Sequence, residues 1–455
     1  MAHETATLAA YVANLEYENI PAEVLERAKV LTLDFLGSAI RARREAESTP
    51  SLLKMLEALA LDGKGEATVF GDSKTWTPAV AALLNGALGH SLDFDDTHAD
   101  SSLHPSAPVV PAAFAVGEMV GASGRDVLTA IVAGYEVCCR LGNALDPTSH
   151  YARGFHPTAT AGTYGAAASA AKLFGLSETQ IISAFGVSGS QAAGSLQFLL
   201  NGAWNKRYQV GAAAMNGVIA ATLARNDFVG STESVEGKHG LLVGYTDDAH
   251  PDKAVSDLGK TYETMKIGVK PYPSCRYTHA AIDALIAMRH EHNLTPDQVK
   301  RVEIGLHRNG ITLTGDAATK RHPRSIVGGQ FSMFFTGALA LDQGRFGWDD
   351  YNRLGEAAID ALANKFDVVR DERLEGRSHP FGARVSITTE DGVHERLHAD
   401  PSGEPNSFPD AQAMQQKFLT LARPVLNVRA EQFADAILSL ERYDRVAKAT
   451  QLGRQ

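Results

Sequence analysis

An unusually dense group of acids and histidines lies between residues 89 and 106, GHSLDFDDTHADSSLHPS. Its members of chemical interest are Asp93, Asp95, Asp96, Asp100, His90, His98, His104 and Thr97. Carboxylates, imidazoles and a hydroxyl can together hold and move protons on a small polar substrate. The alternative is a solvated acidic loop with no chemical role. The three histidines within the same few turns favour chemistry.

An apolar run, TPAVAALLNGALG, precedes this group and predicts a helix with Thr77 as N-cap and Pro78 as its first residue. The acids then follow the C-terminal end of the helix, where the macrodipole disfavours each exposed carboxylate by roughly 0.3–1 kcal/mol. On a continuing helix Asp93 and Thr97, four residues apart, share one face. His104 follows an Asp/Ser turn and is expected to fold back toward them.

Two further motifs carry candidate side chains. In HYARGFHPTAT (150–160), Tyr151 and His156 precede a helix whose cap is expected at Thr158. The N-terminus of such a helix favours an anion, although His156 before a proline also fits a simple turn. In WNKRYQVGAAAMNG (204–217), Lys206 stands just before an alanine-rich helix, and its alternative role is a basic group that reaches the surface.

A fourth motif, VKPYPSCRYTHA (269–280), places Lys270 after a predicted strand and Arg276 before the next helix. The two prolines between them also suit a domain hinge. The chain has a net charge of -10, so an anionic substrate needs local positive charge. Lys206, Lys270 and Arg276 are the candidates for that charge.

The composition narrows the class of protein. A chain of 455 residues exceeds one ordinary core, so two domains are expected. No basic run indicates a nucleic-acid surface. No disulfide framework or zinc site is expected from three cysteines without a CxxC pair. No signal pattern or membrane-spanning run is evident, which predicts a cytoplasmic protein without membrane contact.

The hydrophobic pattern predicts a mainly α protein: a large all-helical domain with a smaller inserted α/β lid domain. Residues 1–262 read as the helical domain. Residues 263–400 alternate with period two at 265–269 and 299–307, and 383–398 fits a hairpin that turns at Asp391–Gly392. Helices are expected between these strands, at 278–293 and 327–341. Residues 401–455 are helical again and are expected to pack back on the first domain.

Several common signatures are absent. No GxGxxG opens a helix after a strand, and GSTESVEGKH (230–239) does not have the spacing of a P-loop. Neither GxSxG nor HExxH occurs. The sequence therefore carries none of these dinucleotide, phosphate-loop, serine-hydrolase or zinc-protease motifs.

Four segments, in this order and spacing, are similar to the MmgE/PrpD family. They are GHSLDFDDTHADSSLHPSAPVVPA, GFHPTATAGTYGAAASAAKLFGL, NKRYQVGAAAMNG and KPYPSCRYTHAAIDA. The family includes 2-methylcitrate dehydratases, cis-aconitate decarboxylases and iminodisuccinate epimerases. The resemblance covers nearly the whole chain. It implies a helical domain, a smaller α/β lid domain, a homodimer, and a reaction without metal or organic cofactor.

The resemblance also implies which residues form the site. The catalytic positions of the family correspond here to His104, Asp93, Thr97, Tyr151, His156 and Lys270. Lys206, Lys270 and Arg276 are the expected substrate-binding residues. The context SHYARGFHPT departs from the longer methylcitrate dehydratases, which leaves the substrate open within the family.

The reaction expected from the sequence is that of a cofactor-independent lyase on a small di- or tricarboxylate. Dehydration in the manner of 2-methylcitrate dehydratase is the first reading, and cis-aconitate decarboxylation or iminodisuccinate epimerisation are its alternatives. A Mg-dependent isoprenoid enzyme would explain DDTHAD as a metal motif, but a second aspartate motif is absent. A non-catalytic carboxylate-binding protein is the remaining alternative.

Overall fold

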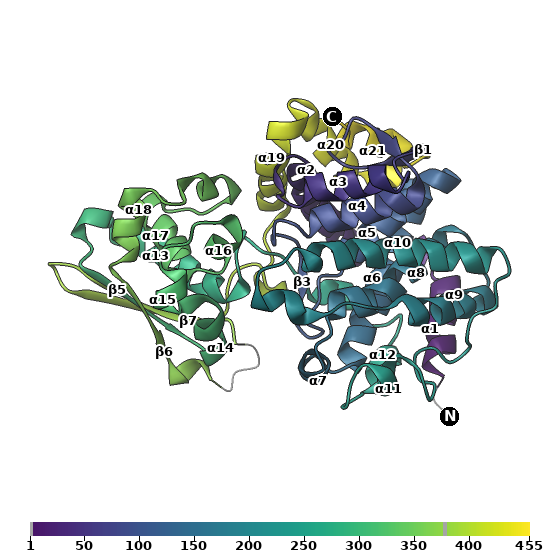
Figure 1. The fold of residues 1–455 in the computed structure, drawn as a ribbon, viewed down its shortest axis with the longest axis horizontal. Helices are drawn as coiled ribbons and strands as arrows, with labels where there is room; N and C mark the ends of the chain where they lie inside the picture. The colour runs from purple at the N-terminus through teal and green to yellow at the C-terminus, as the bar shows by residue number, and fades with distance from the viewer. Residues whose placement is uncertain (1–2, 376–379) are drawn as a thin grey trace. The chain divides into compact units, whose positions relative to one another are not determined.

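The computed structural model describes residues 3–375 and 380–455. It divides into two compact units, Met1–Val269 with Asp410–Gln455 (unit 1) and Lys270–Pro409 (unit 2). The mainly helical fold expected from the sequence is confirmed, and Figure 1 shows the helices of unit 1 and the mixed sheet of unit 2. No helix in the described part of the chain has both the length and the apolarity needed to cross a membrane.

Unit 1 contains helices from both ends of its sequence and two small two-stranded sheets. The helices are α1 (Glu4–Asn14), α2 (Ala22–Glu45), α3 (Thr49–Ala58), α4 (Pro78–Gly89), α5 (Ser106–Val120), α6 (Gly124–Ala144), α7 (Pro147–Ala152), α8 (Pro157–Leu173), α9 (Glu178–Gln191), α10 (Asn205–Arg225), α11 (Leu241–Gly244), α12 (Pro251–Val255), α19 (Ala411–Leu426), α20 (Arg429–Leu438) and α21 (Ala447–Thr450). The strands are β1 (Lys64–Thr68), β2 (Thr75–Trp76), β3 (Thr97–His98) and β4 (Ile267–Gly268).

Small residues let the central helices of unit 1 approach closely. Helix α8 packs against α5, α6 and α10, and α10 also packs against α4. A Cβ added at Gly217 would lie 2.4 Å from Cβ of Ala166, and one at Gly211 would lie 2.3 Å from the carbonyl oxygen of Leu83. Larger side chains would therefore push α10 away from α8 and α4.

The C-terminal helices support the acidic segment. In Figure 1 the yellow α19 lies beside the purple α2, and the two helices are in contact. Lys417 of α19 forms a 2.5 Å ion pair with Asp34 of α2 and donates to the carbonyl oxygen of Phe94 at 2.8 Å. Helix α19 thus holds the backbone of Phe94, the residue between Asp93 and Asp95 in the sequence.

The structure changes one expected strand of this region. The alternating segment 265–269 forms only the two-residue strand β4, which pairs antiparallel with β3 in unit 1. Pro271 and Pro273 follow closely, and proline has no N–H to extend a ladder. By contrast, the expected start of α4 is confirmed, with Thr77 at the N-cap position and Pro78 as the first helical residue, although the Thr77 side chain makes no capping hydrogen bond.

Unit 2 is built on a four-stranded sheet of order β6-β5-β7-β8. The strands are β5 (Arg301–Leu306), β6 (Phe366–Arg370), β7 (Ala383–Thr388) and β8 (Val393–His398). Strand β5 pairs parallel with β6 and antiparallel with β7, and β7 pairs with β8 as the expected hairpin. The sequence did not suggest β6, whose segment FDVVR is short and carries two charges.

The helices of unit 2 cover this sheet. They are α13 (His279–Glu291), α14 (Arg308–Gly310), α15 (Ala317–Lys320), α16 (Ile326–Gln330), α17 (Met333–Gln343) and α18 (Ala357–Ala363). Helix α13 contacts β7 and β8, and α17 contacts α13 and β6. The single helix expected at 327–341 is two helices, because the Ser332 side chain accepts from the N–H of Phe335 and starts a new helix.

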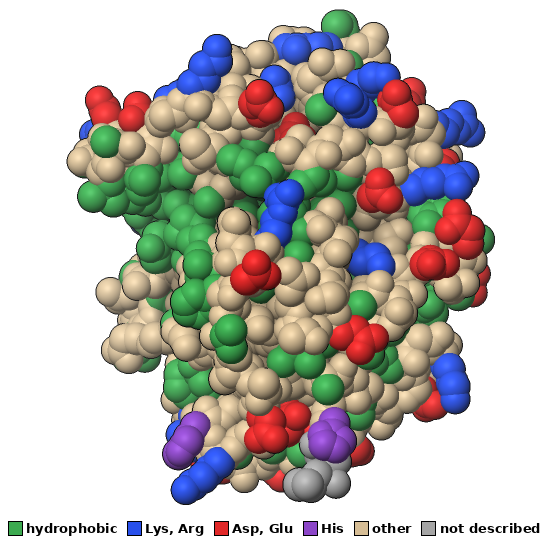
Figure 2. All heavy atoms as spheres, turned by 90° about the vertical axis from the view of Figure 1, so that its right-hand side faces the viewer, with side chains coloured by type: hydrophobic (Ala, Val, Ile, Leu, Met, Phe, Trp, Pro, Cys, Tyr) green, Lys and Arg blue, Asp and Glu red, His purple; other side chains and the backbone are tan. Residues whose placement is uncertain are grey.

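One face of the molecule mixes both signs of charge. Figure 2 shows single basic and acidic side chains scattered over that face, with hydrophobic side chains gathered along its left margin. A continuous basic surface of the kind that binds nucleic acid is not seen on this face.

Candidate active site

Helix α4 stops before the acidic segment, so the acids lie on a loop. The last helical residue is Gly89, and His90 follows as the C-cap. Asp93 has a φ of 52°, a left-handed conformation that ends helical continuation. Thr97 lies in β3, where its backbone pairs with Gly268. The expectation that Asp93 and Thr97 share a helix face is therefore wrong, because one lies on a loop and the other on a strand.

Two histidines converge on one buried carboxylate. Oδ2 of Asp95 lies 2.7 Å from Nδ1 of His90 and 3.5 Å from Nδ1 of His104. The two imidazole rings meet edge to face, with centroids 4.7 Å apart. Nδ1–H of His104 also donates to the carbonyl oxygen of Asp96 at 2.8 Å, which places the lone pair of neutral His104 on Nε2. All three residues belong to the acid and histidine group of the sequence, but only His104 was expected in the site.

The carboxyl group of Asp96 is the first member of a buried hydrogen-bonded chain that continues through the hydroxyl groups of Ser106 and Tyr135. Oγ of Ser106 is 2.5 Å from Oδ2 of Asp96 and 2.5 Å from the hydroxyl oxygen of Tyr135. Burial raises the pKa of the Asp96 carboxyl well above its usual value, and the hydrogen bonds from Ser106 offset only part of this effect. We therefore expect Asp96 to be a neutral acid that fixes the start of α5.

Replacing Asp96 by asparagine is expected to preserve folding and to remove a pH dependence of stability. A carboxyl with a raised pKa in the folded state stabilises the fold below its unfolded pKa and loses that contribution as the pH rises through its folded pKa. Asp96→Asn should therefore become progressively more stable than the wild type as the pH rises above about 4. Urea unfolding between pH 5 and 8 measures the difference. An unchanged difference across that range, matching the exposed control Asp252→Asn, would contradict a neutral Asp96.

His156 is the N-cap of α8, one position before the first helical residue Pro157. Thr158, the expected cap, lies inside the helix instead, because proline suits the first helical position. The ring of His156 stacks on that of His90 with centroids 6.0 Å apart, and its Nδ1 lies 2.9 Å from Nε2 of Gln209. Burial, together with the nearby His90, lowers the pKa of His156 well below its usual value.

Two long helices begin at this histidine cluster. Helix α5 starts two residues after His104, and α8 starts directly after His156. The two helices pack together, and the N–H of His104 donates to the hydroxyl of Thr158 at 3.2 Å. Helix N-termini carry positive potential and unsatisfied N–H groups. The electrostatics of this place therefore suit an anion.

A lysine adds positive charge on the same unit. Lys206 lies in the first turn of α10, and its Nζ is 2.7 Å from Oδ1 of Asp93. Burial alone lowers the pKa of Lys206, but the carboxylates of Asp93 and Asp95 outweigh burial and raise it. The phenol of Tyr151 also contributes to the raised pKa of Lys206. Its hydroxyl donates to the carbonyl oxygen of Ser102 at 3.2 Å.

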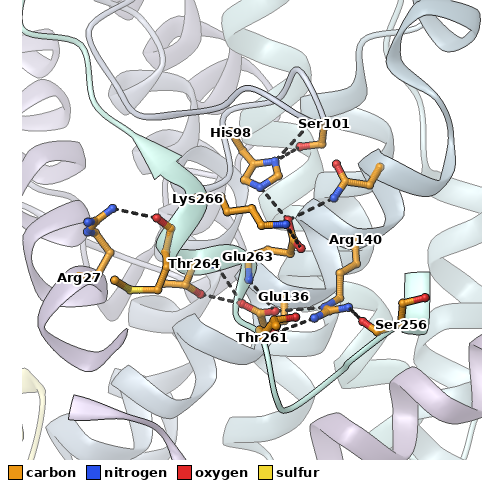
Figure 3. Close-up of polar contacts among 12 residues, drawn as sticks. Arg27, His98, Ser101, Glu136, Arg140, Ser256, Thr261, Glu263, Thr264 and Lys266 are labelled. Atoms are coloured by element: carbon orange, nitrogen blue, oxygen red, sulfur yellow. Dashed lines mark hydrogen bonds and ion pairs between the residues drawn. The ribbon is translucent and has the colours of Figure 1, made fainter. Parts of the chain in front are cut away.

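His98 anchors the far end of the loop and makes different contacts from the other histidines. The N–H of Ser101 donates to Nδ1 of His98 at 3.3 Å, so Nε2–H donates to Glu263 at 3.0 Å (Figure 3). Burial would raise the pKa of Glu263, but its bonds with His98 and Lys266 lower it to about 2. With the β3–β4 pairing, this contact fixes the chain on either side of the acidic loop.

The same view shows how α6 holds the segment around Glu263. Glu136 accepts from the N–H groups of Glu263 and Thr264 at 3.0 Å each (Figure 3). Arg140 bonds to Glu136 at 3.1 Å and donates to the carbonyl oxygen of Thr261 at 2.8 Å. This buried ion pair is thus a support for the loop.

Lys270 and Arg276 belong to unit 2, where Lys270 is buried. The guanidinium of Arg276 donates to Oε1 of Glu404 at 2.5 and 3.1 Å and to the carbonyl oxygen of Ser402 at 3.1 Å. It also donates to Nδ1 of His279 at 2.9 Å. These contacts build Arg276 into unit 2, and its role in substrate binding stays a prediction.

The ligand atoms of the histidine cluster are close enough together for a cation, but two of them already make hydrogen bonds. His90, Asp95 and His104 offer ligand atoms within 4.8 Å of one another. However, Nδ1 of His90 bonds to Asp95, and Nδ1–H of His104 donates to the carbonyl oxygen of Asp96. A cation between these atoms would have to break both hydrogen bonds. The described geometry is that of a hydrogen-bonded group.

A cavity of about 650 Å³ lies elsewhere on unit 1, and none of the candidate residues line it. Two basic side chains that line it already have polar partners. Arg125 lies 3.4 Å from Glu18, and Lys172 donates to the carbonyl oxygen of Ala13 at 2.9 Å. The cavity is therefore separate from the candidate site.

Comparison with known families gives the class of protein. Residues 6–254 match the MmgE/PrpD N-terminal domain, and residues 272–442 match the MmgE/PrpD C-terminal domain. The chain belongs to the MmgE/PrpD family. This confirms the resemblance that the four motifs suggested.

Curated relatives are similar over most of the chain. A cis-aconitate decarboxylase-like protein, oryM, of Aspergillus oryzae is 30% identical over 96% of this chain and 94% of its own. A cis-aconitate decarboxylase of Aspergillus terreus is 28% identical over 98% of this chain and 95% of its own. The cis-aconitate decarboxylase of Homo sapiens is 28% identical over 66% of this chain and 63% of its own.

Proposed function

We propose that this protein is a carboxy-lyase that decarboxylates cis-aconitate or a closely related tricarboxylate. The observation that carries the proposal is the similarity, over nearly the whole chain, to proteins named cis-aconitate decarboxylases. This favours decarboxylation over the dehydration that the sequence alone placed first. The cluster of histidines at the N-termini of α5 and α8, with Lys206 on the same unit, supports a polyanionic substrate.

The chemistry of such a substrate defines what the site must do. Loss of CO2 from the carboxymethyl arm of cis-aconitate breaks one C–C bond and leaves the electron pair in an allylic system. That charge is stabilised when the carboxylate at the far end of the system takes it up. A proton must then be delivered to the carbon next to that carboxylate. The site therefore needs cationic or N–H donors at the carboxylates and one proton donor.

The residues of unit 1 fit these requirements. Lys206 and the N-termini of α5 and α8 are proposed to bind carboxylates, with Asp93 holding the ammonium in place. His104, beside Asp95, is proposed to carry the proton that the allylic carbon receives. Tyr151 is proposed to support binding near Lys206. The roles expected for Thr97, Lys270 and Arg276 remain predictions for mutagenesis.

A substrate screen by NMR tests this function. Purified protein is incubated with cis-aconitate, citrate, 2-methylcitrate and iminodisuccinate, and the products are identified. We expect turnover of cis-aconitate with release of CO2. Loss of water from 2-methylcitrate would instead establish a dehydratase, and inversion of iminodisuccinate an epimerase. Binding of these anions without any turnover would favour a non-catalytic protein.

Chelation is expected to leave the activity intact. The group His90, Asp95 and His104, whose spacing could hold a cation, is already hydrogen-bonded internally, and the sequence has no second aspartate-rich motif. The rate of decarboxylation should be the same after extended dialysis against EDTA, within about twofold, because no step of the proposed chemistry needs a Lewis acid. Loss of activity that Mg²⁺ restores would contradict this account and favour the isoprenoid-type alternative.

The assembly and the partners are also proposals. The family resemblance implies a homodimer, which light scattering on the purified protein would test. No nucleic acid or membrane partner is proposed.

A further inference from the structure

We propose that Gln209 is a positioning residue that fixes His156 as its Nε2–H tautomer, so that His156 acts as a neutral hydrogen-bond donor to a substrate carboxylate. The identity of the ligand rests on the proposed function. The state of His156 in the resting protein does not, and it can be measured separately.

The orientation of the Gln209 amide follows from its two contacts. Nε2 of Gln209 lies 3.5 Å from the carbonyl oxygen of Ser195, which can only accept a hydrogen bond. The same nitrogen lies 2.9 Å from Nδ1 of His156. An amide nitrogen is a donor, so Nδ1 must be the acceptor. The single proton of the neutral ring is then on Nε2.

The Gln209 amide lies beside the backbone that also binds His156. Gln209 lies on α10, one turn after Lys206. A Cβ added at Gly194 would lie 3.4 Å from Cδ of Gln209 and 2.7 Å from Cβ of Ala159. The N–H of His156 donates to the carbonyl oxygen of Gly194 at 3.0 Å. The backbone at 194–195 therefore accepts hydrogen bonds from both the Gln209 amide and the N–H of His156.

The other nitrogen of this ring, Nε2, is the one that we propose to meet the ligand. His156 is 2% exposed, and no hydrogen bond to its Nε2 occurs among residues 3–375 and 380–455. The titratable groups that act on His156 are His90 of the α4 end, Lys206 of α10 and His150 of α7. With burial they lower the pKa of His156, so the ring is neutral near pH 7. A neutral imidazole can still donate through N–H to a developing negative charge.

This tautomer separates the roles of the two histidines. A neutral Nε2–H cannot transfer its proton without forming an imidazolate, so His156 stabilises charge and does not supply the proton. His104 lies beside Asp95 and the carbonyl oxygen of Asp96, which both favour an imidazolium. The proton for carbon is therefore assigned to His104, and the stabilising hydrogen bond to His156.

The first test measures the tautomer directly. Protein labelled with 15N-histidine is studied by two-dimensional NMR at pH 7 without ligand, and the His156 signals are assigned by their loss in His156→Asn. We expect the 15N chemical shift of an unprotonated nitrogen at Nδ1 and that of a protonated nitrogen at Nε2. In Gln209→Glu the new carboxylate can only accept, so Nδ1 should become protonated. In Gln209→Met the preference for Nε2–H should weaken.

The second test follows the kinetics with cis-aconitate. Gln209→Glu and Gln209→Met are expected to lower kcat by roughly 10- to 100-fold, as for loss of one strong hydrogen bond in the transition state. KM should change less, and the pH profile of Gln209→Glu should shift as its His156 becomes a cation. Gln416→Glu, on the exposed face of α19, is the matched control and should retain wild-type kinetics.

The outcomes separate this proposal from the proposed function. A protonated Nδ1 in the wild type would overturn the proposal, as would an Nε2–H tautomer that persists unchanged in both Gln209 variants. Unchanged kcat in both variants would overturn the role of His156 as a donor. If the protein decarboxylates nothing while the NMR signature is as expected, the proposed function fails and the assignment of Gln209 stands.

Discussion

Replacing His104 by alanine is expected to lower kcat by roughly 100- to 10,000-fold, the range for loss of a general acid or base. The imidazole is the group placed between Asp95 and the Asp96 carbonyl, and we propose that it delivers the proton to carbon. KM should change much less, because Lys206 and the helix N-termini remain. Steady-state kinetics with cis-aconitate measure both constants.

The fold should tolerate this substitution. The variant loses the hydrogen bond to the Asp96 carbonyl, worth about 1 kcal/mol, while the backbone bond from residue 104 to Thr158 remains. The melting temperature should therefore stay within a few degrees of that of the wild type. His239→Ala, at an exposed position of the same unit, is the control. Near wild-type turnover in His104→Ala would show that this histidine is structural and would make Tyr151 the next candidate.

Replacing Lys206 by methionine is expected to lower kcat/KM by roughly 10- to 100-fold, because a charge-assisted hydrogen bond contributes about 1.5–3 kcal/mol. The ammonium of Lys206 is held by Asp93 at 2.7 Å. Of the three basic residues that the sequence selected for substrate binding, Lys206 is the one on unit 1. Lys206→Arg keeps the charge and should recover part of the loss. Comparing kcat/KM between the two variants separates the effect of the charge from that of the side-chain shape.

Stability must be measured beside these rates. Without Lys206, the largely buried carboxylate of Asp93 loses its ion-pair partner, so some destabilisation is expected. Asp93→Asn combined with Lys206→Met should restore stability but not kcat/KM. Lys238→Met, at an exposed position without an ion pair among the described residues, is the matched control. Wild-type kcat/KM in Lys206→Met would remove the lysine from the binding site.

Much of the fold could be predicted because periodicity and turn chemistry are local. Thr77 and Pro78 define the start of α4, and Asp391–Gly392 separates the strands of the 383–398 hairpin. The short β4 could not be predicted, because its length depends on pairing with β3 and on the prolines that follow. Strand β6 was missed for the same reason, since its partner β5 is more than fifty residues away.

The candidate site was predicted in part. The types and motif positions of His104, His156, Tyr151 and Lys206 were sufficient to select them, whereas their contacts depend on tertiary structure. The helix expected to continue to Thr97 ends at Gly89, and the left-handed Asp93 turns the chain. Asp95 had no signal that set it apart from the neighbouring aspartates, and Gln209 had no local signal. Their importance arises only because the fold brings them to His90, His104 and His156.

One measurement tests the central claim most directly. Purified protein is incubated in deuterated water with cis-aconitate carrying 13C in the carboxyl group of its carboxymethyl arm, and the mixture is followed by NMR. The account predicts that the label leaves as 13CO2 and that each product molecule gains a single deuteron at the carbon next to the retained carboxylate. It also predicts that His104→Ala slows both events together. Label that stays in the organic product, or hydration without release of 13CO2, would contradict the account.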